Sequence, residues 1–322
     1  MENESNEGLG LWEHQYEDHL LPMFLEISET MLDLYMEVEM EDVVNIDICD
    51  EGDQLPVVEY VEDIYANYRR IIENCSLISS DYMSQQFEID EVTRAIIIDW
   101  LIEVHDELKL QPEALFLFVS LQDRFLAKQC ATTDNLQLVA MVAMLLSRKY
   151  EKDSVLLVKD LSSYADDSYS TSEILEMEKL MLNTLEYDMS QPTAYVFITR
   201  FLKAARSEPQ LDHLSFFLIE LCLREYAMLK FPPSLLAAAS VYTAQCSLYG
   251  LRQWSKTCEW YTKYSEDQLL ECSRMIVGYH QWSTIRSVYR KYNTLEFGYA
   301  ARCKPAKFLV KETNNFFQTN NC

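Results

Sequence analysis

The residue types that most often perform catalysis or bind metals are present in this sequence, but not in patterns that support either role. The five histidines, His105 among them, do not stand with Cys or carboxylate residues at metal-ligand spacing. Cys130 and Cys246 lack the His and Asp context that activates a thiol. There is no Gly-rich phosphate loop. We therefore expect a protein that is not an enzyme, with no catalytic residues, no metal and no cofactor.

Charged residues stand inside an unusually apolar stretch, residues 93–104. Three consecutive isoleucines there would suit a strand, but helical spacing fits the whole run better. Arg94 and Asp99 are then charges on a helix that is apolar nearly all round. Such a helix belongs at the centre of a bundle, where each charge needs a partner. One face of the helix carries Ile96, Ile97, Trp100 and Val104, and the opposite face carries Ile98, Leu101 and Ile102.

Lys149 and Glu178 are two further charged residues that could act on a partner. Lys149 follows an apolar run at 136–146, and Glu178 stands among the apolar residues of a predicted helix at 171–186. Residue type alone favours structural roles: a lysine that interacts with the dipole at a helix C-terminus, and a glutamate solvated at a helix edge. The alternative is a charged contact with another protein.

Composition predicts a helical protein with an acidic surface. The chain has 322 residues, of which 49% are hydrophobic and only six are Gly and eight Pro, too few for a turn-rich all-β fold. The net charge of −25 argues against nucleic acid or an anionic membrane as the main partner and favours a basic one. Nine cysteines without a Cys-x-x-Cys pair indicate reduced thiols. With no evident signal peptide or membrane span, we expect a soluble intracellular protein in the nucleus, the cytoplasm or both.

The elements that must position these residues follow in a simple order. Residues 1–55 contain no Lys or Arg and form an acidic arm that composition predicts to be flexible. The alternative is that residues 20–40 form a short helix that docks on a partner or on the body. Residues 56–90 hold an amphipathic helix at about 57–74 and a polar connection. Two helical units at 91–189 and 190–290, followed by an irregular tail at 291–322, complete the predicted domains.

The two helical units repeat one another. Apolar periodicity and start signals predict helices at 91–109, 112–128, 134–150, 155–164 and 171–186, and again at 193–205, 211–227, 232–249, 255–263 and 266–282. The third helices match best, because residues 140–146 and 236–242 are both rich in small side chains. We therefore expect each third helix to lie inside its unit. A period of about 100 residues favours tandem domains over a solenoid, whose repeats are shorter.

Several motifs together resemble one family. Residues 93–104 are similar to the Met-Arg-Ala-Ile-Leu-Val-Asp-Trp-Leu-x-Glu-Val signature of the cyclins. Residues 123–126, 136–139, 147–151 and 177–179 follow in cyclin order and spacing, and residues 56–65 and 287–292 resemble B-type (G2/mitotic) cyclins, plant ones especially. The resemblance implies an all-α fold of two five-helix cyclin boxes with an extra N-terminal helix. It also implies a regulatory subunit that binds and activates a cyclin-dependent kinase at the G2/M transition.

The resemblance implies roles for particular residues as well. Arg94 and Asp123 would form a structural ion pair between the first two helices of the first box. Kinase binding would centre on Lys149 and Glu178, with further contacts from Leu146, Tyr150, Glu151, Leu182, Tyr187, Ile64 and Tyr68. Arg-x-Leu segments of substrates or inhibitors would dock on a patch formed by Ile96, Ile97, Trp100, Glu103, Leu136 and Gln137. Core packing is the alternative for that apolar stripe.

The sequence departs from the family pattern in places. Thr93 stands where the signature has Met, which would make one wall of the docking patch polar, and Lys152 stands where many relatives have Glu. Residues 1–68 contain no Arg, so the arm lacks the family's destruction signal. Two alternatives remain open. One is a divergent cyclin-fold adaptor that does not activate a kinase, and the other is a cyclin-fold transcription factor, against which the net charge argues.

Overall fold

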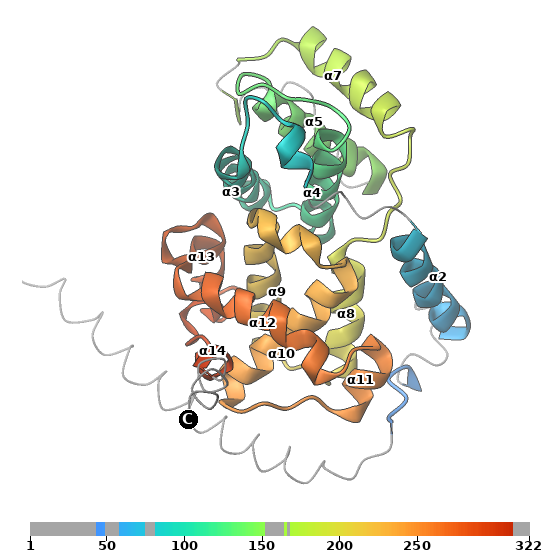
Figure 1. The fold of residues 1–322 in the computed structure, drawn as a ribbon, viewed down its shortest axis with the longest axis vertical. Helices are drawn as coiled ribbons and strands as arrows, with labels where there is room; N and C mark the ends of the chain where they lie inside the picture. The colour runs from blue at the N-terminus through green and yellow to red at the C-terminus, as the bar shows by residue number, and fades with distance from the viewer. Residues whose placement is uncertain (1–42, 49–57, 75–80, 152–163, 166–167, 312–322) are drawn as a thin grey trace, which may run out of the picture.

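The computed structural model describes residues 43–48, 58–74, 81–151, 164–165 and 168–311. Across these ranges the regular elements are helices, which form two bundles stacked along the long axis of the molecule (Figure 1). The first bundle contains α3 (Glu91–Glu107), α4 (Pro112–Leu126), α5 (Leu136–Glu151) and α7 (Thr171–Thr184). The second contains α8 (Ala194–Ala204), α9 (Pro209–Arg224), α10 (Pro233–Tyr249), α11 (Lys256–Thr262) and α12 (Glu266–Gln281). The prediction of an all-α protein with tandem bundles is confirmed.

Shorter elements flank the bundles. A 3-10 turn, η2 (Val58–Tyr60), leads into α2 (Val61–Asn74), which lies beside the second bundle in Figure 1, and η3 (Tyr82–Gln85) precedes the first bundle. After the second bundle come η5 (Ser283–Ile285), α13 (Ser287–Tyr292), η6 (Ala300–Arg302) and α14 (Phe308–Lys311). The tail predicted to be irregular therefore has short helices as far as residue 311, held by buried Ala301, Ala306 and Leu309.

Local sequence signals explain where the helices begin. Capping boxes, in which a side chain at the N-cap and one three residues later each bond the other's backbone, start α3 at Asp90, α7 at Ser170 and α12 at Ser265. Prolines occupy the first turn of α4, α9 and α10, where the missing N–H costs nothing. The predicted helix at 155–164 lies, apart from its last residue, outside the described residues, as does the possible helix at 20–40.

The centre of each bundle is its small-residue helix. Every residue from 138 to 148 of α5 is buried, and so is every residue from 237 to 246 of α10. Alanine and serine at these positions let neighbouring helices approach closely, so α5 packs on α3, α4 and α7, and α10 packs on α8, α9 and α12. The prediction for the third helices is therefore confirmed. None of the helices described is long and apolar enough to span a bilayer.

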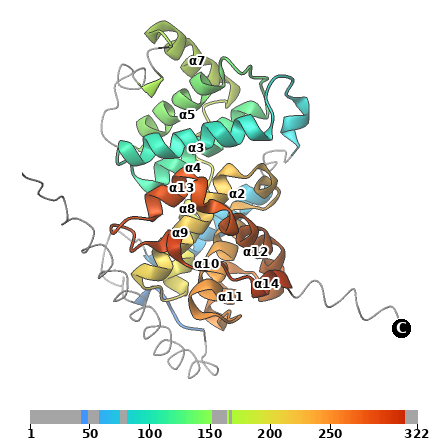
Figure 2. The same ribbon diagram turned by 90° about the vertical axis from the view of Figure 1, so that its left-hand side faces the viewer.

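Helix α3 lies at the junction of the bundles, and the prediction of a central position is corrected. It packs on α4 and α5 of its own bundle, and also on α9 and α13 from the other half of the chain (Figure 2). Ile98, Leu101 and Ile102 are fully buried, whereas Ile96 is 60% exposed. The helix is apolar on nearly every side because each of the two bundles covers one of its faces. A remaining edge, which carries Ile96, is open to solvent.

The acidic arm also requires a correction. Residues 43–48, part of the stretch predicted to be flexible, lie against the second bundle, with Ile46 and Asp47 both buried. Composition predicted flexibility because the arm is acidic and contains no cation. The opposite charges that hold it come from α8, far along the chain.

Two histidines are buried in neutral form. His105, at the end of α3, is 3% exposed, and its Nε2 lies 3.0 Å from the carbonyl oxygen of Gln111. Burial, with a smaller contribution from nearby cations, Lys291 foremost, lowers its pKa to about 3. His280 in α12 packs against the Phe217 ring at 5.3 Å, and burial lowers its pKa to about 4. Both histidines are therefore uncharged in the folded protein at neutral pH.

We predict that the folded state loses stability between pH 7.5 and pH 5.5. In this range the unfolded chain protonates histidines with an ordinary pKa of about 6.5 and the folded chain does not, so acid favours unfolding by about 1 kcal/mol for each histidine. Urea unfolding at the two pH values measures the loss. His105→Gln should remove about half of it, and an unchanged pH dependence in that variant would contradict the assignment.

Candidate functional site

Arg94 lies where the two bundles meet. Its Nε and Nη2 donate to the two carboxylate oxygens of Asp123 on α4, each at 2.7 Å, so the pair joins α3 to α4. Its Nη1 donates to the carbonyl oxygen of Arg224 at 3.1 Å, at the end of α9 in the second bundle. Both members of the pair are fully buried. Burial alone would lower the pKa of Arg94, but the Asp123 carboxylate outweighs it and raises that pKa.

Two tyrosines complete this network, and sequence reasoning missed both. The Tyr82 hydroxyl donates to Asp123 Oδ1 at 2.8 Å, and burial raises the pKa of that hydroxyl. The Tyr226 ring meets the Tyr82 ring edge-on at 5.2 Å and lies 5.8 Å from the Arg94 guanidinium carbon. Tyr82 precedes the first bundle and Tyr226 follows α9, so only the fold brings them together.

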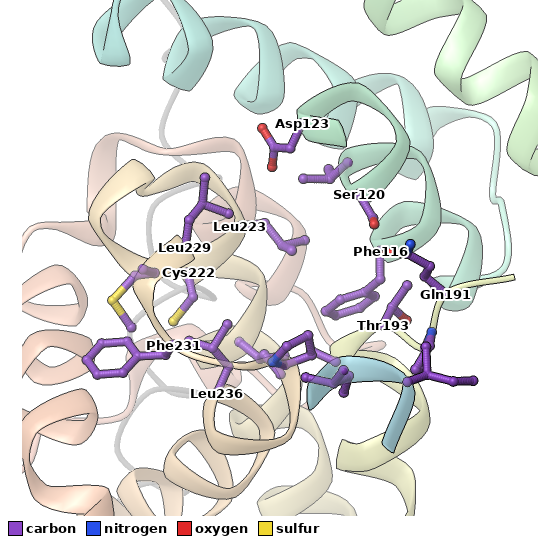
Figure 3. A pocket seen from close by; sticks show the side chains of 18 of the residues that line it. Phe116, Ser120, Asp123, Gln191, Thr193, Cys222, Leu223, Leu229, Phe231 and Leu236 are labelled. Atoms are coloured by element: carbon purple, nitrogen blue, oxygen red, sulfur yellow. The ribbon is translucent and has the colours of Figure 1, made fainter. Parts of the chain in front are cut away.

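A cavity of about 130 Å³ lies beside this network, between the bundles (Figure 3). Its walls come from α2, α3, α4, the connection before α8, and the elements α9, η4 (Tyr226–Lys230) and α10. Most of the lining is apolar, and its ionisable side chains, Arg94 and Asp123, are already paired. Cys222 also faces it, but burial raises the pKa of this thiol well above its ordinary value, so it is not a reactive thiolate. Among the described residues, no group of His, Cys, Asp and Glu could hold a metal ion.

Lys149 and Glu178 meet at the surface of the first bundle. Lys149 stands at the end of α5 and donates from Nζ to Glu178 Oε1 on α7. The lysine side chain is 53% exposed and the glutamate 12%, so the pair is open to solvent on the lysine side. Because the ammonium group of Lys149 is hydrated, its contact with Glu178 contributes little net free energy, so Lys149 can leave Glu178 for a charged group of a partner at low cost.

Aromatic side chains are exposed around this pair. Tyr150, next to Lys149, is 47% exposed, and Tyr187, just past the end of α7, is 66% exposed. Glu186 and Tyr187 both have positive φ, a conformation that costs non-glycine residues free energy and is often found at functional sites. Leu182 and Glu151 are partly buried, and burial, followed by the Glu113 charge, raises the pKa of Glu151.

Leu146 and Tyr68, two other residues predicted to contact the kinase, are less accessible. Leu146 is only 4% exposed, a correction: it belongs to the core, because the small-residue helix α5 draws its neighbours close. On α2, Ile64 is 36% exposed. Tyr68 instead packs edge-on against Phe197 of α8 at 6.3 Å, so it helps to attach α2 to the second bundle.

The predicted docking patch is partly buried as well. Ile96 is well exposed, and Trp100 and Gln137 are partly exposed. Ile97 and Leu136 are only 9% and 5% exposed, so they form the floor beneath the patch, which corrects their predicted role as direct contacts. A helical stripe identifies a face but not how deeply the neighbouring helix covers it.

Two polar residues at this patch are already bonded within the chain. Glu103 forms an ion pair with Arg290 of α13, a residue that sequence reasoning did not assign to the patch. Thr93 uses its hydroxyl in the N-terminal cap of α3, where it accepts from the Asp90 backbone N–H at 2.8 Å and also bonds the Asp90 side chain. The hydroxyl of Thr93 is therefore satisfied locally rather than left as a free polar wall.

Comparisons with known proteins agree with this architecture. The family model described as the cyclin N-terminal domain matches residues 63–190, and the cyclin C-terminal domain model matches residues 192–306. The chain is 54% identical over 309 residues to G2/mitotic-specific cyclin-2 of Medicago sativa, a match that covers 92% of this chain and 94% of that protein. It is 52% identical over 304 residues to Cyclin-B2-1 of Arabidopsis thaliana, covering 92% and 71%.

Solved structures show the same fold at lower sequence identity. A viral cyclin from herpesvirus saimiri matches with a TM-score of 0.61 and 21% identity, covering 70% of this chain and 98% of that one. A chain of the yeast RNA polymerase II CTD kinase complex matches with a TM-score of 0.54 and 14% identity, covering 76% and 82%. At these identities the match supports the fold and not the details of any site.

We predict that Asp123→Ala lowers the free energy of unfolding by about 3–5 kcal/mol, because it leaves Arg94 buried without a counter-charge. Thermal unfolding measures the change. Asp106→Ala is the matched control, since it removes an aspartate whose pair with Lys109 is exposed, and it should shift stability by less than about 1 kcal/mol. Equal melting temperatures for Asp123→Ala and the unmodified chain would show that the pair does not hold the junction.

Proposed function

Because the chain belongs to the cyclin family, we propose that it binds a cyclin-dependent kinase through its first cyclin box and activates that kinase at the G2/M transition. Cyclins are non-catalytic regulatory subunits of such kinases, so the chain is not an enzyme. Similarity to plant proteins named as G2/mitotic cyclins supports the timing. The observation that carries the proposal is the solvent-open Lys149–Glu178 pair beside the exposed Tyr150 and Tyr187.

The proposed surface combines two features of protein interfaces. Tyr150 and Tyr187 offer large apolar area at low entropic cost, because a tyrosine side chain has few rotatable bonds. Lys149 and Glu178 offer one charge of each sign, which fixes the orientation of a partner with complementary charges. Since an exposed pair is weak, the kinase can replace either member without a large loss of free energy.

Activation requires only a difference in binding. An active kinase needs an ion pair between a lysine and a glutamate, and the glutamate stands on a helix whose position varies. A partner that packs against that helix in its inward position stabilises the active state. To move an equilibrium from 1:99 to 99:1, the cyclin must bind the active state about 10⁴-fold more tightly than the inactive one. No residue of the cyclin has to take part in proton or phosphoryl transfer.

Substrate recruitment would use the second surface, on α3. Ile96 and Trp100 would take the Leu of an Arg-x-Leu segment, and Glu103 would take its basic residue. Arg290 already forms an ion pair with Glu103, so the arginine of an incoming segment must displace Arg290. The ion pair is exposed on both sides, which keeps the cost of displacement small. Docking is therefore supported, but in competition with a contact inside the chain.

We predict that the double variant Lys149→Ala, Glu178→Ala binds a cyclin-dependent kinase at least about tenfold more weakly, because it removes the charged centre of the interface. Co-purification and calorimetry measure binding, and a histone kinase assay measures activation. Helical content and melting temperature should stay near those of the unmodified chain.

The matched control removes another exposed pair from the same box. Lys109→Ala with Asp106→Ala deletes an exposed Lys–Asp contact at the end of α3. It should leave kinase binding within about twofold. Unreduced kinase activation by the Lys149, Glu178 double variant would refute the proposed interface, whereas binding without activation in the unmodified chain would indicate an adaptor.

We predict opposite effects of two substitutions on binding of an Arg-x-Leu peptide. Arg290→Ala should tighten binding by roughly two- to fivefold, the equivalent of an exposed ion pair, because it frees Glu103. Glu103→Ala should weaken binding by a similar factor. Fluorescence anisotropy with a labelled peptide measures both, with an Ala-x-Ala peptide as the control. Weaker binding by Arg290→Ala would mean that Arg290 supports the patch rather than competes for it.

A further inference from the structure

Residues 43–48 are held along the second box by backbone and side-chain contacts. The backbone N–H of Val44 donates to Thr257 Oγ1 at 3.2 Å, and that of Ile46 donates to the Tyr261 hydroxyl at 3.4 Å. Thr257 and Tyr261 both stand on α11. The Ile46 side chain is 8% exposed, so the middle of this stretch is seated on the box, whereas Val43 and Ile48 at its two ends are exposed.

Asp47 is the centre of this contact. Both of its carboxylate oxygens accept from the Arg200 guanidinium on α8, one of them at 2.6 Å, and Lys203 Nζ lies 2.9 Å from Oδ1. Asp47 and Arg200 are each 7% exposed. The hydrogen bonds from Arg200 lower the pKa of Asp47 below its ordinary value, so the carboxylate is charged at neutral pH.

The same arginine holds helix α2. Its guanidinium carbon lies 5.4 Å from the centre of the Tyr65 ring on α2 and 5.1 Å from the Tyr261 ring on α11, so it is placed between the two helices. Arg200 Nη2 also donates to Glu62 Oε1 of α2 at 3.4 Å. Arg200 thus joins three segments: the arm, α2 and the second box.

Helix α2 is attached to the body mainly by side chains. The Tyr65 hydroxyl donates to the carbonyl oxygen of Val196 at 2.8 Å, and Arg69 donates to that of Tyr261 at 2.6 Å. Tyr65 and Tyr68 pack edge-on against Phe197 at 6.1 and 6.3 Å. Tyr65 and Tyr261 both lie against the Arg200 guanidinium, so its orientation affects how α2 is seated.

We propose that Arg200, Lys203, Thr257 and Tyr261 form a socket for an acidic segment, that Asp47 is its intramolecular ligand, and that occupancy of the socket positions α2 for the kinase. Without Asp47, Arg200 and Lys203 lose their shared counter-charge, and Arg200 keeps only its longer contact with Glu62 and its contacts with the Tyr65 and Tyr261 rings, so its position between α2 and α11 is less fixed. Asp47 is therefore a positioning residue that acts on the kinase contact through α2. This last step rests on the proposed function, because it requires that α2 carries part of the kinase interface.

The experiment compares Asp47→Asn with the unmodified full-length chain by hydrogen–deuterium exchange and by kinase affinity. We expect exchange in α2 to be roughly tenfold faster or more in the variant, because α2 opens locally, while exchange in α5 stays unchanged. We expect kinase affinity to fall by roughly 5- to 100-fold, the usual range for coupling between two sites. Asp267→Asn removes the same charge from a 91% exposed position and should change neither quantity.

Two further variants guard against misfolding and against a purely structural role. Lys203→Met removes the more exposed cation of the socket and should produce a smaller change in the same direction. Asp47→Glu keeps the charge and should restore most of the kinase affinity lost in Asp47→Asn. Faster exchange in α2 with unchanged kinase affinity would overturn the positioning role. Unchanged exchange in Asp47→Asn would overturn the socket itself. If the unmodified chain binds no kinase, the proposed function fails, and the exchange data still decide whether the socket exists.

Discussion

A buried arginine dictates how the two boxes fit together. Arg94 has no exposed surface, so each of its three guanidinium nitrogens must find an acceptor inside the protein. Asp123 supplies two, and the third is a backbone carbonyl at the end of α9. Because that carbonyl belongs to the second box, the pair sets the docking of one box on the other as well as the packing of α3 on α4. The adjoining cavity shows that apolar packing at the junction is less complete than the polar network beside it.

Two further buried ion pairs fasten segments that are distant in the sequence. Glu220 of α9 accepts from Lys291 at 2.8 and 2.9 Å and from the Tyr292 hydroxyl, which fixes α13 on the second box. Asp47 and Arg200 fix the arm and α2 in the same way. Buried pairs often add little net stability, because desolvation offsets attraction, but a wrong arrangement would leave charges unpaired. In this chain they determine which segments meet. Lys291 places α13, and α13 carries the Arg290 that reaches Glu103.

Sequence reasoning recovered the features that depend on local chemistry. Ser170 and Ser265 start helices through capping boxes with the residue three positions later, which needs only neighbouring residues. The small residues of α5 and α10 likewise predict a central position. It failed where the partner lies far away. Asp47 lies in a stretch without helical periodicity, residues 43–48, and the cation that pairs with it, Arg200, is 153 positions later. Periodicity also could not separate the exposed Ile96 from the buried Ile97, because both lie on one side of α3.

The contrast in burial explains how one chain can be both rigid and responsive. A buried pair cannot change partners without exposing an uncompensated charge to an apolar interior, so Arg94, Glu220 and Arg200 hold fixed arrangements. Lys149–Glu178 and Glu103–Arg290 are open to solvent, where water replaces a lost partner at little cost. Surfaces that must release an internal contact to accept a protein are therefore built from exposed pairs. The Asp47–Arg200 contact combines the two cases. The pair itself is buried, but the helix that it contacts, α2, keeps Ile64 exposed to solvent. Its fixed geometry would then be transmitted to a surface that is free to bind.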